Sequence, residues 1–320
     1  MLRSARSTRI AQTFALPTIA IIAAACGGEV KVKDVKEVGG DTANPVARIT
    51  VPGPTDSSTG TVVSPSTPTQ AVSIAEGEKV YQEKRYADAA ALFSTYVDQH
   101  PNNPWGHYML GLSSWKAGDL GRAESALVRA NELDPKHVKT LLNLTRVHLD
   151  QGRPKDALAR VNAALVLDSS SGEAYRLLGR TRSALNQPNE AIAAYRLALS
   201  HDPRDVWSMN NVGLILIQQG SFEEALGPLA LAAQLDANVA TFQNNLGIAL
   251  EHTGRFTLAT QAFKSALAAD EGYTKAKLSL ARVDGRKEDP TVTPVELTTL
   301  AESFDREIRG VQMGGPVPKN

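Results

Sequence analysis

The chain repeats itself every 34 residues from Gln70 onward, and this period constrains its fold more than any other feature. Position 20 of all six repeats is alanine, and position 24 is always a larger apolar residue. Position 8 is glycine in every repeat except the third, which has Thr145. Small residues recurring beside large ones predict pairs of closely crossing helices. The repeats start at Gln70, Pro104, Val138, Gly172, Val206 and Ala240.

Turn-forming residues divide each repeat into two helices. Glycine follows the first helix in four repeats, where a left-handed turn is expected. These glycines are Gly118, Gly152, Gly220 and Gly254. Pro154 and Pro188 fall at the start of second helices, where a missing N–H costs little. Gly227-Pro228 interrupts the second helix of the fifth repeat, and we expect a kink there because an interior proline costs about 3 kcal/mol.

This pattern resembles the tetratricopeptide repeat family over residues 70–273. The family's small-large spacing is visible in the second repeat at Leu110-Gly111, Ala123, Ala130 and Pro135. The resemblance implies an all-α fold: a right-handed superhelical α-solenoid of six 34-residue helix-turn-helix repeats. It also implies that the first helices line a concave groove, so function should be sought in that groove.

The residues after the repeats, 274–309, predict capping helices. Thr274 to Val283 continues the first-helix pattern, and Thr293-Pro294-Val295-Glu296 is typical of a capping box with proline at the first helical position. The apolar face of the following helix is Leu297, Leu300, Ala301, Phe304 and Ile308. We expect this helix to fold back on the solenoid end, with a partner-binding tail as the alternative. Residues 310–320 predict a disordered tail.

Residues 1–25 have the anatomy of a signal peptide. Three arginines precede a 16-residue apolar run, which is short for a membrane-spanning helix of about 20 residues. The run ends in Ala23-Ala24-Ala25-Cys26-Gly27, which resembles the lipobox of bacterial lipoproteins. That resemblance implies a lipidated Cys26, carrying palmitate, and an outer membrane location facing the periplasm, since no Asp follows the cysteine. The alternatives are a plain secretory signal, another bacterial membrane or the cell surface.

The stretch between the cysteine and the repeats, residues 26–69, predicts a disordered tether. From Gly39 to Gln70, 20 of 32 residues are Gly, Pro, Ser or Thr. Such a segment contains too little apolar surface to fold.

Composition and missing motifs argue against several classes of function. With 34 Lys+Arg against 34 Asp+Glu there is no excess positive charge for nucleic acid. The single cysteine excludes an internal disulfide. The sequence has no phosphate-binding loop, nucleophile motif or metal-ligand spacing, so we expect no enzyme activity, cofactor, metal or small-molecule substrate. His148 and Asp150 suggest only a surface pair.

The family resemblance implies that positions 2, 5, 9 and 12 of each first helix face the groove. The apolar candidates for partner binding are Trp105, Tyr108, Leu112, Trp115, Leu142 and Leu149. Packing against the first repeat is the alternative for these side chains. The polar candidates, which suit a carboxylate or a peptide backbone, are Arg146, Arg176, Arg180, Asn210, Asn211, Asn244 and Asn245. A solvated polar lining is the alternative for the second set.

Together these features predict a lipoprotein adaptor that binds protein partners in its groove and the membrane through its lipid. In architecture the chain resembles tetratricopeptide lipoproteins that act as pilotins for secretins of type IV pili. That resemblance implies a role in assembling an envelope complex. The alternatives are a periplasmic scaffold for cell-wall enzymes and a component of adhesion or gliding machinery.

Overall fold

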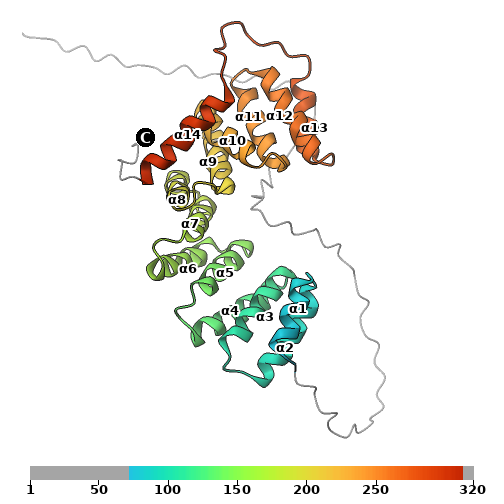
Figure 1. Cartoon of the computed structure of the whole chain (residues 1–320), viewed down its shortest axis with the longest axis vertical. Coiled ribbons are helices and arrows are strands. Elements are labelled where there is room, and N and C mark those ends of the chain that lie inside the picture. Colours follow the sequence, from blue (N-terminus) through green and yellow to red (C-terminus); the bar gives the residue numbers. More distant parts are fainter. Residues whose placement is uncertain (1–71, 313–320) are drawn as a thin grey trace, which may run out of the picture. The chain divides into compact units, whose positions relative to one another are not determined.

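The computed structural model describes residues 72–312, in which every regular element is an α-helix (Figure 1). Twelve of the helices form six successive pairs, and the all-α fold of paired helices is therefore confirmed. The pairs are α1 (Ile74–Gln82) with α2 (Tyr86–Gln99), α3 (Pro104–Lys116) with α4 (Leu120–Leu133), α5 (Val138–Asp150) with α6 (Pro154–Leu167), α7 (Gly172–Ala184) with α8 (Pro188–His201), α9 (Val206–Gln218) with α10 (Phe222–Leu235), and α11 (Ala240–His252) with α12 (Phe256–Ala269). Two further helices follow, α13 (Thr274–Val283) and α14 (Leu297–Gln312). The predicted signal peptide, Cys26, the whole tether and the tail beyond residue 312 lie outside the described residues.

The turn inside each pair depends on one residue in the left-handed region. Four of these residues are the glycines predicted from the sequence, with φ between 70° and 87°. In the first and fourth pairs the same position holds Lys84 (φ 62°) and Asn186 (φ 58°). Asparagine tolerates this conformation better than most side chains, whereas lysine gains nothing from it. The first pair therefore turns at a higher conformational cost than its neighbours.

The two helices of a pair cross closely because glycine faces a large side chain. A Cβ at Gly77 would lie 2.7 Å from Cζ of Phe93, and one at Gly213 would lie 2.3 Å from Cγ of Leu229. Both distances are shorter than van der Waals contact. The large side chain therefore occupies the space that a Cβ would need.

The third pair departs from this rule at both positions together. Thr145 replaces the glycine, and the residue in register with Phe93 and Leu229 is Val161, the smallest of the six. Both are fully buried, and the Thr145 hydroxyl donates to the carbonyl of Leu141 (2.8 Å). The larger residue on one helix is thus balanced by the smaller one on the other.

Side-chain sizes are also matched where one helix pair packs against the next. Tyr96 on α2 occupies a position that is alanine in the other five repeats, and a Cβ at Gly106 on α3 would lie 2.8 Å from its ring. At the junction between the fifth and sixth pairs the sizes are reversed, with Ala232 on α10 and the buried Phe242 on α11. Each junction therefore accommodates one large side chain at most.

Helix α14 does not pair with α13. It packs across α10 and also contacts α8, with Ala301, Phe304 and Ile308 buried (Figure 1). The sequence led us to expect a cap on the solenoid end, but α14 lacks the repeat pattern that such pairing needs. If Ala301 is aligned with the alanine of position 20, position 24 becomes Asp305. A carboxylate is costly to bury in a helix crossing, so α14 packs on another apolar surface.

Gly227 and Pro228 lie where α14 crosses α10. Helix α10 is continuous, with Pro228 inside it. A Cβ at Gly227 would lie 3.4 Å from the Leu300 carbonyl oxygen and 3.4 Å from Cβ of Phe304, so glycine permits the close approach. Helix α6 buries only three residues, whereas α10 is buried on several faces. The buried residues of α10 are Ala225, Leu226, Pro228, Leu229, Ala230, Leu231, Ala232 and Ala233.

Arg255 fixes the segment that leads into α14. Its Nη1 donates to Oε1 of Glu223 (2.7 Å), and its Nε and Nη2 donate to the Thr293 carbonyl (3.3 and 3.1 Å). Helix α14 begins at Leu297, later than the predicted start at Pro294, and the Thr293 carbonyl bonds to Arg255 instead of serving a first helical turn.

Candidate functional site

Among the first helices and α13, contacts join α1 with α3, α3 with α5, α5 with α7, α9 with α11 and α11 with α13. We call the surface that they form the first-helix face. At two junctions the side chain at position 2 of one repeat reaches position 9 of the repeat before it. The indole Nε1 of Trp105 donates to Oε1 of Glu78 (2.7 Å), and Glu173 forms an ion pair with Arg146 in the same register.

Trp105 and Tyr108 form an aromatic cluster at the start of α3. Their rings stack with centroids 5.1 Å apart, and the ring of His137 meets Tyr108 edge-on at 4.9 Å. Trp105 remains 42% exposed, whereas Tyr108 is buried and its hydroxyl accepts from Nδ2 of Asn143 (3.1 Å). Burial raises the pKa of Tyr108, although the Asn143 hydrogen bond opposes the shift. Only Trp105 of this pair offers an open surface.

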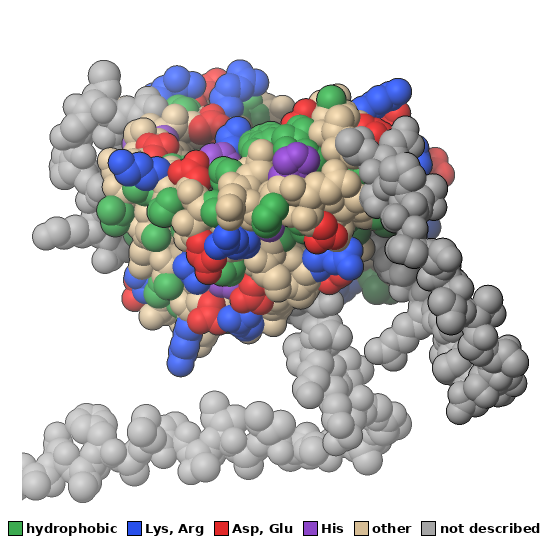
Figure 2. All heavy atoms as spheres, turned by 90° about the horizontal axis from the view of Figure 1, so that it is seen from below, with side chains coloured by type: hydrophobic (Ala, Val, Ile, Leu, Met, Phe, Trp, Pro, Cys, Tyr) green, Lys and Arg blue, Asp and Glu red, His purple; other side chains and the backbone are tan. Residues whose placement is uncertain are grey.

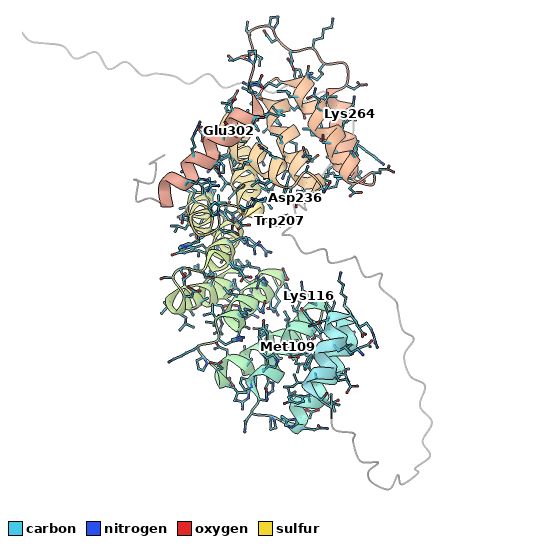
Figure 3. The ribbon with its side chains drawn as sticks, in the orientation of Figure 1. Met109, Lys116, Trp207, Asp236, Lys264 and Glu302 are labelled. Carbon is cyan, nitrogen blue, oxygen red and sulfur yellow. The ribbon has the colours of Figure 1, made fainter. Side chains whose placement is uncertain are left out.

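Trp115 lies at the other end of α3 and is half-buried. Its indole Nε1 donates to Oδ2 of Asp150 on α5 (2.7 Å). The ammonium group of Lys116, labelled in Figure 3, lies 4.4 Å from the Trp115 ring centroid, and the guanidinium of Arg146 lies 6.0 Å from it. Cations therefore already occupy the vicinity of this ring.

The predicted leucines divide between surface and core. Leu112 and Leu149 are half-buried on the first-helix face. Leu142 is buried in a cluster with Leu141 and Val161. Of the six apolar candidates, Tyr108 and Leu142 thus contribute mainly to packing, and the other four retain exposed surface.

The three predicted arginines differ in their partners. Arg146 donates from Nη1 to Oδ1 of Asn143 (2.8 Å) in addition to its ion pair with Glu173. Arg176 lies 3.7 Å from the Asp205 carboxylate. Arg180 forms no ion pair with a described residue, and its Nε is buried without a hydrogen-bond acceptor.

The predicted asparagines lie mostly between helices. Asn245 on α11 donates from Nδ2 to Oδ1 of Asn210 on α9 (2.9 Å), and both side chains are buried. Asn244 is only 2% exposed, and its Oδ1 accepts no hydrogen bond within the described part of the chain. Asn211 is half-buried. Asn210 and Asn245 are 35 residues apart, and so are the hydrogen-bonded Tyr108 and Asn143. This separation is the sequence feature that could have predicted the Asn210–Asn245 bond.

Glu124 on α4 is the centre of a partly buried cluster that sequence reasoning missed. Its carboxylate accepts hydrogen bonds from Gln151 Nε2 (3.0 Å), Arg153 Nη1 (2.8 Å) and His148 Nε2 (3.1 Å). His148 is buried, so the expected surface pair with Asp150 is wrong. Burial alone would raise the pKa of Glu124, but the three hydrogen bonds outweigh it and lower the pKa to about 2.

Replacing Glu124 with glutamine is expected to lower the free energy of unfolding at pH 7 by about 1–2 kcal/mol, since charged hydrogen bonds are lost from a partly exposed site. Because the pKa of Glu124 is lower in the folded state, its charge stabilises the fold fully at pH values above the ordinary pKa of 4.5. This stabilisation is lost as the pH falls through the folded-state pKa of about 2. Urea unfolding from pH 7 to pH 2 should show the two proteins converging at low pH. Glu132→Gln, an exposed carboxylate beside Arg129, is the control. An offset for Glu124→Gln that stays constant to pH 2 contradicts the assignment.

Other kinds of site are not found among residues 72–312. No group of three or more His, Cys, Asp or Glu side chains in this range could hold a metal ion. None of the helices in the same range combines the length and apolar character needed to cross a membrane. Figure 2 shows acidic and basic side chains interspersed over the face in view, with apolar side chains between them. Recognition on such a surface depends on local groups more than on a broad field of one sign.

Comparisons with known families and structures agree with the helix pairs. Two family profiles, both described as tetratricopeptide repeat, match the sequence, one over residues 114–181 and the other over residues 176–240 and 230–274. A search of curated proteins found no match.

Several solved structures are similar at low sequence identity. PilF of Pseudomonas aeruginosa is 19% identical with a TM-score of 0.52, over 65% of this chain and 88% of PilF. MamA is 27% identical with a TM-score of 0.46, over 52% of this chain and 97% of MamA. YrrB, described as a tetratricopeptide repeat protein with an unusual peptide-binding site, is 19% identical with a TM-score of 0.46, over 58% of this chain and 96% of YrrB. The likeness to PilF shows the fold alone.

Proposed function

Because this chain is a tetratricopeptide repeat protein, we propose that it is a scaffold whose first-helix face, from α1 to α7, binds a segment of a partner protein. Domains of this family bind peptides and proteins, and the family's scaffolds are generally not enzymes. The observation that carries the proposal is Trp105, a large aromatic side chain left 42% exposed between helices of two repeats. Exposed tryptophan is among the commonest anchors of protein interfaces.

The surroundings of Trp105 suit a partner segment. Leu112, Trp115 and Leu149 add half-buried apolar surface along α3 and α5. Arg146, bonded to Asn143 and Glu173, is held in place beside them. Apolar anchors surrounded by fixed polar groups are the usual composition of a binding surface.

The finer proposal is a lipoprotein adaptor for an envelope complex, lipidated at Cys26 and anchored in the outer membrane facing the periplasm. It is supported by the arginines, apolar run and small residues before Cys26. The combination of such a cysteine with six repeats supports a role beside a secretin of a type IV pilus. A scaffold for cell-wall enzymes and a part of adhesion or gliding machinery are the competing roles.

In-cell crosslinking of the membrane fraction, followed by mass spectrometry, tests the proposal. Trp105→Ala is expected to reduce capture of the partner at least tenfold. Truncating an aromatic anchor of a protein interface typically weakens the binding free energy by roughly 2 kcal/mol or more. Val166→Ala is the matched control, since Val166 is 87% exposed but lies on α6, a second helix. Cys26→Ser is expected to move the protein out of the membrane fraction.

The captured proteins decide between the roles. A secretin or other pilus subunit supports the adaptor, whereas cell-wall hydrolases or synthases, or adhesion components, support its competitors. Capture that is equal in wild type and Trp105→Ala overturns the first-helix face as the binding surface. Membrane retention of Cys26→Ser overturns the lipid anchor.

A further inference from the structure

We propose that Trp105 and Glu78 together form a site for a cationic side chain of the partner, with arginine preferred to lysine. This inference rests on the proposed function, because it specifies what the first-helix face recognises at its N-terminal end. The site combines an open aromatic ring with a carboxylate that is fixed at its edge.

The geometry of the site favours a planar cation. Tyr108 stacks on the Trp105 ring at 5.1 Å, the His137 ring meets it in a T-shaped arrangement at 6.3 Å, and the Trp105 side chain remains 42% exposed. The Glu78 carboxylate accepts one hydrogen bond, from the indole Nε1 at 2.7 Å, and has further lone pairs available. A guanidinium can stack on the ring and donate to the carboxylate at the same time. An ammonium group can lie over the ring or donate to the carboxylate, but it has no planar face that stacks on the indole.

The second indole of α3 provides an internal comparison. Trp115 has the same arrangement, with its Nε1 hydrogen-bonded to the carboxylate of Asp150. Its ring already has two cations near it, Lys116 at 4.4 Å and Arg146 at 6.0 Å. An indole bonded to a carboxylate on this face can therefore have cations close to its ring.

At Trp105 the chain supplies no such cation from its described residues. In residues 72–312 no Lys or Arg lies over the Trp105 ring, and Glu78 forms no ion pair. Lys79 and Lys139, the nearest bases by sequence and register, are both exposed. Within residues 72–312 the Glu78 charge therefore has no basic partner.

The test uses the full-length chain labelled with 15N and two short peptides, acetyl-Gly-Ser-Arg-Ser-Gly-amide and the same peptide with neutral citrulline in place of arginine. The indole Nε1–H signal of Trp105, assigned with Trp105→Phe, is followed during titration. We expect the arginine peptide to shift this signal and to bind about three- to tenfold more tightly than the citrulline peptide, as for a cation–π contact with a charged hydrogen bond.

Glu78→Gln is the decisive variant, because glutamine still accepts the indole hydrogen bond but carries no charge. This variant should bind the arginine peptide about three- to tenfold less tightly than wild type and bind the citrulline peptide with unchanged affinity. Glu76→Gln, which removes another exposed acid of α1 that does not contact Trp105, should change neither. A lysine peptide that binds less tightly than the arginine peptide supports the stacking geometry.

Three results overturn the proposal: equal binding of the two peptides, arginine binding unchanged in Glu78→Gln, or no shift of the Trp105 signal at millimolar peptide. These results are distinct from a failure of the proposed function. If in-cell capture depends on Trp105 while Glu78→Gln has no effect on it, the scaffold stands and the cation site falls. If capture is independent of Trp105, the binding face itself is wrong.

Discussion

Replacing Gly213 with threonine is expected to lower the free energy of unfolding by about 2–3 kcal/mol. A Cβ at this position would lie 2.3 Å from Cγ of Leu229 and 2.6 Å from its Cδ2, so α9 and α10 must move apart. Threonine and glycine differ little in helix propensity, so the loss reports the crossing and not the backbone. Urea unfolding followed by circular dichroism measures it.

The third helix pair suggests a second substitution that should restore the stability lost in Gly213→Thr. Because Thr145 coexists with Val161, the double variant Gly213→Thr with Leu229→Val should recover much of the loss, whereas Leu229→Val alone should cost about 1 kcal/mol. Gly121→Thr is the matched control, since a Cβ there meets nothing closer than 3.9 Å. Additive losses in the double variant would show that the crossing is not set by these two positions.

Replacing Phe304 with alanine is expected to release α14 from α10, because a buried phenylalanine contributes about 3–5 kcal/mol of packing. Its ring lies in the apolar face that covers α10, beside Gly227. Hydrogen exchange with mass spectrometry should show lost protection across residues 297–312 together with increased exchange in α10. The remaining pairs should keep their protection, since each contacts only its neighbours.

Glu302→Ala is the control for this experiment. Glu302 is exposed on the same helix and is labelled in Figure 3. It should leave exchange in both helices unchanged. If Phe304→Ala instead leaves α14 protected, its docking depends mainly on other contacts, such as the ion pair between Arg196 and Glu307 (3.0 Å).

The sequence predicted the helix pairs well because their determinants are local. The period places glycine or alanine at fixed crossings, and helices α3 and α5 begin at Pro104 and Val138, the starts expected from the repeat. It did not predict that Lys84 and Asn186 adopt the left-handed turn, because lysine is not typical of it and asparagine is a weaker signal than glycine. The fold imposes that conformation from both ends of the turn.

Contacts between repeats were harder to predict than contacts within them. Asn210 and Asn245 each suggest a polar lining when considered alone, and only the structure shows that they bond to each other. The docking of α14 on α10 also depends on two segments far apart in sequence. Glu78 was overlooked for the same reason, since its importance comes from Trp105 in the next repeat.

The size matching at the junctions means that the repeats are not interchangeable modules. Joining the first repeat directly to the sixth would bring Tyr96 against Phe242, two rings where each natural junction accommodates one. Loss of the second to fifth repeats by recombination at this period would therefore produce a steric conflict, even though both remaining repeats retain the correct pattern. The first repeat, which carries Glu78, is thus matched in size to a small residue on the next helix, as Gly106 provides, and not to the phenylalanine of the sixth repeat.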